Sequence, residues 1–133
     1  FEAQKAQTPS YYGYAGHARA RRVEILLDAG QNDEAWELGK NLTSDDSLTL
    51  RLIAARAKEH PIDAADACRK LVEQALVPTG EHAYVNAVEL LLLYKKYTRA
   101  AGQETQFKTF CQQIKTNLWR RRNLLDLLAR HHL

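Results

Sequence analysis

The chain of 133 residues has an apolar fraction of 45% and a charged fraction of 26%, which are ordinary values for a single globular domain. Its net charge of +3 is uneven: residues 80–133 carry nine basic and four acidic side chains, whereas residues 1–43 and 44–79 each carry five basic and six acidic ones. No apolar run approaches the roughly 20 residues that cross a bilayer. The composition therefore excludes a membrane-spanning segment and a uniformly basic protein.

The ends of the chain and its cysteines bear on its cellular context. The sequence begins at Phe1, contains no methionine and shows no signal-peptide pattern, which predicts a piece of a longer polypeptide. Cys68 and Cys111 stand far apart and form neither a CxxC pair nor a zinc motif. We expect two buried, reduced thiols, a cytoplasmic location, and neither a metal nor a cofactor.

Helical periodicity runs through the first half of the chain, and strand alternation is nowhere persuasive. A first helix is expected to be regular over residues 15–29 and to end at the left-handed stop Gly30. A second helix is expected over residues 32–42. A third follows the turn at 43–45, which supplies its N-cap, and runs to Ala57. The apolar positions of the third helix that are expected in the core are Leu48, Leu50, Leu52, Ile53, Ala54 and Ala57.

The second half of the chain predicts four more helices. Pro61 suits the first turn of a fourth helix, which stops at residues 78–80. A fifth and most apolar helix runs to Gly102, and a sixth begins at residue 103 or 104 and reaches Leu118. Whether it continues through Arg120–Arg122 stays open at this point, and a last short helix is expected over 123–129. Apolar positions expected in this core include Ile62, Cys68, Leu71, Val72, Tyr84, Val88, Leu91, Leu92, Tyr94, Tyr97, Phe107, Phe110 and Ile114.

The breaks between helices share a form, which predicts a repeat. Gly30, His60 and Gly102 each follow an amphipathic helix and open the next one, at spacings of 30 and 42 residues. These spacings lie near the roughly 34-residue tetratricopeptide period and the longer armadillo-like one. We therefore expect an all-α fold: an α-α superhelix of about three antiparallel hairpins plus a C-terminal capping helix. Residues 1–10 are expected to be a frayed segment, and 11–133 a single helical-repeat domain.

The second half of the chain also resembles known proteins. The runs 84–91, 101–107 and 119–128 are similar to the C-terminal region of bacterial proteins that carry a SWIM-type zinc finger, and to uncharacterised bacterial helical-repeat proteins. The resemblance implies a tetratricopeptide-like helical region within a larger bacterial protein. The Cys/His zinc finger itself is absent, so its zinc and presumed nucleic-acid roles transfer to no residue here.

The sequence does not favour catalysis. It contains no glycine-rich phosphate loop, nucleophile elbow, HExxH or EF-hand motif. The paired carboxylates Asp33-Glu34 and Asp45-Asp46 fall in first turns of expected helices, where they complement the helix dipole. His60 is expected at a helix C-terminus, where its partial positive charge offsets that dipole. A hydrolytic or zinc-dependent enzyme is the least favoured hypothesis.

Binding is the favoured function, through either of two sets of residues. A non-catalytic protein-interaction or scaffold module would use the concave face of the repeats. Its candidate contacts are Arg51, Arg56, Lys58, Lys95, Lys96 and Tyr97. The alternative is nucleic-acid binding along a basic helical ridge whose members are Lys108, Lys115, Trp119, Arg120, Arg121 and Arg122. The basic ridge has two competing interpretations: it binds an acidic protein partner, or it is only a solvated helix face. Trp119 could also be a core residue. Pairing into a homodimer through exposed ends is a further expectation.

Overall fold

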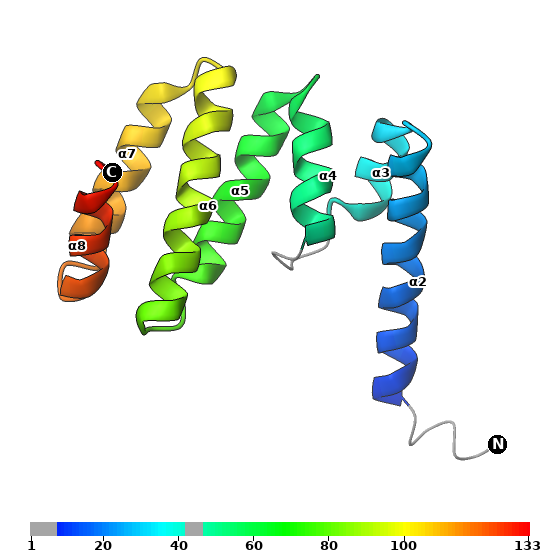
Figure 1. Cartoon of the computed structure of the whole chain (residues 1–133), viewed down its shortest axis with the longest axis horizontal. Helices are drawn as coiled ribbons and strands as arrows, with labels where there is room; N and C mark the ends of the chain where they lie inside the picture. The colour runs from blue at the N-terminus through cyan, green and yellow to red at the C-terminus, as the bar shows by residue number, and fades with distance from the viewer. Residues whose placement is uncertain (1–7, 42–46) are drawn as a thin grey trace. The chain divides into compact units, whose positions relative to one another are not determined.

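The computed structural model describes the backbone of residues 8–41 and 47–133, and the side chains of residues 18–41 and 47–133. Throughout these ranges the regular structure is α-helical and no strand occurs, so the all-α prediction is confirmed. None of the described helices is long and apolar enough to cross a membrane. The described helices are α2 (Thr8–Asp28), α3 (Asn32–Gly39), α4 (Ser47–Ala57), α5 (Pro61–Ala75), α6 (Glu81–Ala100), α7 (Glu104–Asn117) and α8 (Arg122–Arg130), which Figure 1 shows in chain order.

The chain divides into two compact units, residues 1–56 and 57–133, which are described separately. The single domain expected over 11–133 stays a prediction. The frayed segment expected for residues 1–10 lies mostly outside the described residues, and α2 is already helical from Thr8. The turn expected at 43–45 also lies outside them.

Two helices end in the glycine stop that the sequence predicts. Gly30 has φ 78°, its N–H donates to the carbonyl of Leu27, and the N–H of Gln31 donates to Leu26. Gly102 has φ 70°, and the next N–H, of Gln103, donates to Thr98 over 2.7 Å. These paired bonds are the Schellman motif, in which a left-handed residue lets the last carbonyls of a helix find donors.

The break at His60 is of a different kind, and its expected role at a helix C-terminus is wrong. His60 has an extended φ of −134° and is the N-cap of α5, directly before Pro61. The prediction failed because the Pro61 that follows restricts this residue to extended backbone, where no left-handed stop forms. A helix break is nevertheless present at all three positions, since α4 ends at Ala57 and α5 begins at Pro61, but of the three only Gly30 and Gly102 form the left-handed stop.

Unit 1 is packed around a glycine. A Cβ atom at Gly39 of α3 would lie 2.7 Å from Cδ2 of Leu52 in α4 and 3.0 Å from Cγ2 of Val23 in α2. Both neighbours are essentially fully buried. The three helices approach one another closely here because residue 39 has no side chain.

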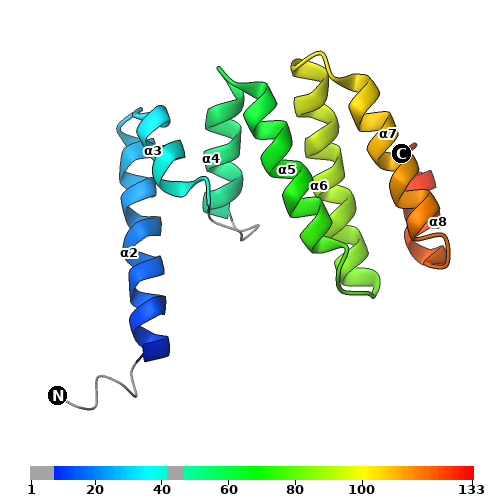
Figure 2. The ribbon, with the colours of Figure 1, turned by 180° about the vertical axis from the view of Figure 1, so that it is seen from behind.

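Unit 2 is built around α6, which contacts α5, α7 and α8 (Figures 1 and 2). Tyr94 lies at its centre: its ring is 5.8 Å from that of Phe107 and 5.3 Å from that of Phe110, the latter edge-on. Such tilted and edge-to-face arrangements are the favourable ones for aromatic pairs. Leu124 and Leu128, one turn apart in α8, are fully buried, so α8 covers the core with one face.

The expected core is largely confirmed, with a few exceptions. Tyr84, Tyr94 and Tyr97 are buried, and both cysteines are free thiols in the interior. Burial raises the pKa of Cys68 to about 12. The expected core positions that are instead exposed or only half-buried are Leu48, Leu50, Ala54, Ala57, Ile62 and Leu92. A helical period identifies the buried face but does not locate its margins.

Candidate binding site

The expected basic ridge is not one continuous helix. α7 ends at Asn117, residues 118–121 form a turn closed by the N–H of Arg121 donating to the carbonyl of Leu118, and α8 begins at Arg122. The question that the sequence left open is thus answered: the helix does not continue through Arg120–Arg122, although the apolar Leu118 and Trp119 preserve a helical pattern across the turn. Lys108 and Lys115 therefore belong to α7, whereas Arg120 and Arg121 lie in the turn and Arg122 begins α8.

The three consecutive arginines have different surroundings. Arg121 is half-buried, and its Nη1 donates to the carbonyl of Leu76 at 2.5 Å. Leu76 is the C-cap of α5, so Arg121 supplies a donor to a helix end, where a cation also complements the dipole. Arg120 and Arg122 are exposed. The guanidinium of Arg120 lies 5.0 Å from the ring of Trp119, whose exposed fraction of 59% rules out a core position.

The candidate contacts from unit 1 are occupied in ion pairs. Arg51 pairs with Asp28 at 2.6 Å and Arg56 with Asp33 at 2.9 Å. The guanidinium of Arg56 also lies 5.3 Å from the ring centre of Trp36, which it helps to cover. These arginines stabilise the α2–α3–α4 packing.

The remaining candidates for the protein-binding face belong to unit 2, and their surroundings differ. Lys58, in the turn between α4 and α5, is exposed. Lys96 is exposed and lies 5.8 Å from the ring centre of the buried Tyr97. Lys95, one residue earlier, is half-buried and faces a pocket that sequence reasoning did not predict.

This pocket, called the α6–α7 pocket below, lies between the C-terminal half of α6, one face of α7 and residues 132–133. Its volume is about 450 Å³, within the range of sites that take a ligand or a peptide side chain. Its lining residues are Lys95, Thr98, Arg99, Glu104, Phe107, Lys108, Cys111, Gln112, Lys115, His132 and Leu133. It gathers one residue from the first candidate set and two, Lys108 and Lys115, from the second.

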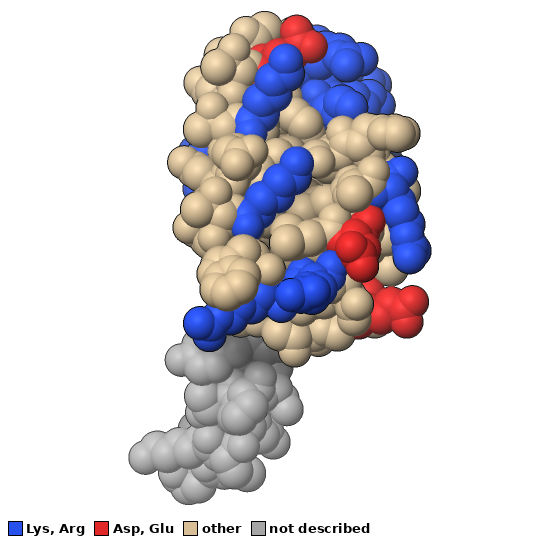
Figure 3. Space-filling view, turned by 90° about the vertical axis from the view of Figure 1, so that its left-hand side faces the viewer, with Lys and Arg blue, Asp and Glu red and all other residues tan. Residues whose placement is uncertain are grey.

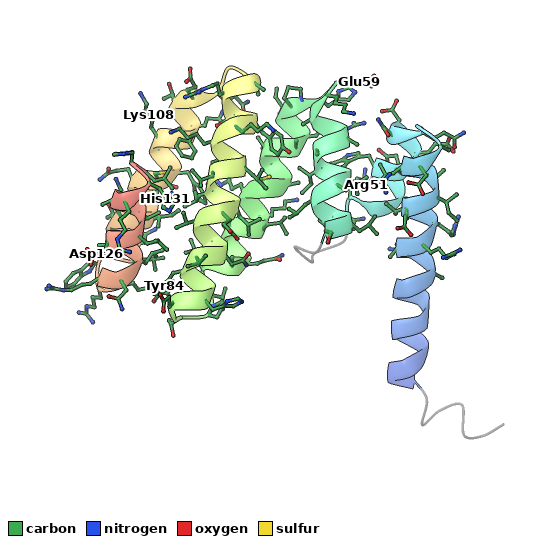
Figure 4. The ribbon with its side chains drawn as sticks, in the orientation of Figure 1. Arg51, Glu59, Tyr84, Lys108, Asp126 and His131 are labelled. Atoms are coloured by element: carbon green, nitrogen blue, oxygen red, sulfur yellow. The ribbon has the colours of Figure 1, made fainter. Side chains whose placement is uncertain are left out.

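The rim of the α6–α7 pocket is basic. Arg99 is offset by Glu104, which lies 3.5 Å away. Among the described residues, no carboxylate lies within ion-pair distance of Lys95, Lys108 or Lys115. The face of the molecule that carries α7 and α8 shows lysine and arginine side chains spread over a largely uncharged surface, with few acidic ones (Figure 3). Figure 4 shows Lys108 extending outward from α7.

The floor of the α6–α7 pocket is apolar. Phe107, Cys111 and Leu133 are each less than a tenth exposed. Leu133 is placed by a third Schellman motif, in which the left-handed residue is His132 (φ 59°) and the N–H of Leu133 donates to the carbonyl of Leu128. Burial raises the pKa of the Cys111 thiol, and the nearby ammonium groups of Lys115 and Lys95 partly oppose that rise. Both lysines therefore act electrostatically on the pocket floor.

Helical spacing accounts for the composition of this pocket. In α7, Phe107 and Lys108 lie four and three residues before Cys111, and Lys115 lies four residues after it, which places them on one face. Lys95 and Arg99 are likewise one turn apart in α6. The sequence shows that these residues share a face within each helix, but it does not show that the faces of α6 and α7 lie opposite each other.

A second, smaller pocket of about 290 Å³ lies between the start of α6 and α8. Its charged lining residues are mixed in sign: they are Glu81, Asp126 and Arg130 (Figure 4 labels Asp126). A cation one turn from a carboxylate on a helix partly neutralises it. This pocket therefore has no clear charge preference, unlike the α6–α7 pocket.

Comparison with protein-family models, curated proteins and solved structures finds no match for the chain.

Proposed function

We propose that the chain is a non-catalytic protein-binding module whose binding site is the α6–α7 pocket. The observation that carries this proposal is the combination of an apolar floor and three lysines that have no carboxylate partner within the described part of the chain. A polar rim around an apolar centre is the general anatomy of a protein-interaction site. In a folded domain, lysines gathered around an apolar pocket repel one another, so their clustering is better explained by a partner than by stability.

The module belongs, in this proposal, to a tetratricopeptide-like α-α superhelix within a bacterial cytoplasmic protein. Two observations support the repeat. The Schellman motif recurs at Gly30 and Gly102, and each time it closes the turn of a helical hairpin, α2–α3 and α6–α7. Leu124 and Leu128 cover one side of unit 2 with a short amphipathic helix, as the terminal capping element of a repeat array does.

The chemistry of the pocket favours binding over catalysis. Cys111 is the only thiol among the residues that line the pocket, and burial raises its pKa. A reactive cysteine needs the opposite, a lowered pKa that supplies thiolate near neutral pH. The hydroxyl of Thr98 is engaged with the carbonyls of Tyr94 and Lys95, at 2.8 and 3.0 Å, so it stabilises α6.

Site-specific photocrosslinking tests the proposal. A photoreactive amino acid replaces Gln112, an exposed residue of the pocket wall, and the protein is irradiated in a nuclease-treated bacterial extract. We expect discrete protein adducts from this position. The matched control carries the same group at Glu89, which is exposed on α6 but does not line the pocket. Equal adducts from both positions, or none from Gln112, would refute the pocket as a protein-binding site.

Nucleic-acid binding is the second candidate, and one observation favours it. Trp119 is exposed, with the guanidinium of Arg120 over its ring, and exposed aromatics beside arginines form stacking platforms for unpaired bases. The test is binding of a single-stranded oligonucleotide to the wild-type chain and to the variants Trp119→Ala and Arg120→Gln. Arg121 stays unchanged in this test, because its hydrogen bond to Leu76 makes it part of the fold.

A further inference from the structure

The α6–α7 pocket is selective enough to indicate the chemistry of its occupant. Resting on the function proposed above, we infer that it binds an acidic segment of a protein partner, with aspartate or glutamate on both sides of one apolar side chain. Carboxylates of the segment would pair with the pocket lysines, and its apolar side chain would lie on the floor formed by Phe107, Cys111 and Leu133.

The positions of the charges support this assignment. Lys108 and Lys115 are two turns apart on α7, and Lys95 belongs to the facing helix α6, so cations surround the apolar floor from two sides. A segment with one central apolar residue between acidic ones matches that arrangement. Because Lys95 and Lys115 are half-buried, water screens their interaction with a bound carboxylate less than it screens a fully exposed pair.

The aromatic content of the pocket favours a peptide over a nucleic acid. Phe107 is only 8% exposed, so its ring face cannot stack on a base. The exposed aromatic residue of this region, Trp119, does not line the pocket. A polynucleotide would satisfy the lysines but would leave the apolar floor without a matching group.

Fluorescence anisotropy tests the inference directly. The probes are four labelled oligomers: an acidic peptide with one central leucine, the same peptide with glycine in place of leucine, a lysine-rich peptide with the central leucine, and a single-stranded oligonucleotide. We expect the first to bind best. Replacing leucine by glycine should weaken binding about tenfold, because it removes one buried apolar side chain. Raising the salt from about 0.05 to 0.5 M should weaken it further.

Two variants locate the binding. The double substitution Lys108→Gln with Lys115→Gln should lower the affinity for the acidic peptide about five- to tenfold. The matched control, Lys40→Gln with Lys70→Gln, removes the same charge from exposed residues that do not line the pocket and should leave the affinity within about twofold. Circular dichroism of both variants verifies that they fold, and the single variant Lys108→Gln, at an exposed position, is the alternative if the double variant does not.

The inference is overturned if the lysine-rich peptide binds as well as the acidic one, if the two double variants weaken binding equally, or if only the oligonucleotide binds. Its failure is distinguishable from failure of the proposed function. Adducts specific to Gln112 without an acidic preference would mean that the pocket binds protein of a different chemistry. The absence of such adducts would refute both the acidic-segment inference and the proposed protein-binding function.

Discussion

Replacing Tyr94 by alanine is expected to destabilise unit 2 by about 3–5 kcal/mol, the usual loss for truncating a large aromatic residue in a core. Tyr94 is 2% exposed, and its ring contacts both Phe107 and Phe110, so its removal opens a cavity between α6 and α7. The free energy of unfolding is measured by urea denaturation, with amide hydrogen exchange of α6 to assign the loss to this unit.

Two further variants make this prediction specific. Tyr94→Phe keeps the ring and should cost no more than about 1.5 kcal/mol, because it removes only the hydroxyl group. Val85→Ala, at a position of the same helix that is 41% exposed, should cost less than about 1 kcal/mol. A loss for Tyr94→Ala as small as that for Val85→Ala would contradict the aromatic centre of unit 2.

Replacing Gly39 by valine is expected to destabilise unit 1 by about 3 kcal/mol through overpacking. The first added atom would already lie 2.7 Å from Leu52, and the neighbouring Val23 is a stiff, β-branched residue with no room to turn aside. The smaller Gly39→Ala should cost less, because it gains about 1 kcal/mol in helix propensity that offsets part of the clash. Thermal unfolding measures both.

The control for this series is Ala54→Val in α4, which adds a β-branched side chain at an exposed helical position. It should change the free energy of unfolding by less than about 0.7 kcal/mol, the range of helix propensities among ordinary residues. If Gly39→Val unfolds no earlier than Ala54→Val, the close approach of α2, α3 and α4 at this glycine is wrong.

The helices could be predicted from the sequence because their signals are local. Gly30 and Gly102 mark helix ends, since the left-handed backbone favours glycine there, and Pro61 marks a helix start. His132 adopts the same left-handed backbone as those glycines although it is not a glycine, so the sequence does not predict this helix end. The kind of helix stop at His60 was predicted wrongly, because the Pro61 that follows keeps His60 in extended backbone and out of the left-handed region.

The candidate site depends on which faces of the helices pack against each other. Neighbouring residues in the sequence do not determine this packing. Lys95, Lys108 and Lys115 are 20 residues apart at their extremes and were assigned to two different surfaces, although packing of α6 against α7 brings them to one pocket. Arg121 shows the converse case. It is adjacent in sequence to the exposed Arg120 and Arg122 but is committed to the carbonyl of Leu76, 45 residues away.

Mapping the bound acidic peptide by backbone amide chemical shifts would test the central claim most directly. Isotope-labelled protein is titrated with the leucine-containing acidic peptide up to about 1 mM, a concentration that detects even weak binding. We predict that the largest shifts fall in residues 95–115, around the α6–α7 pocket. Shifts centred on residues 118–122 or on α2 and α3, or no shifts at all, would contradict the binding of an acidic segment in that pocket.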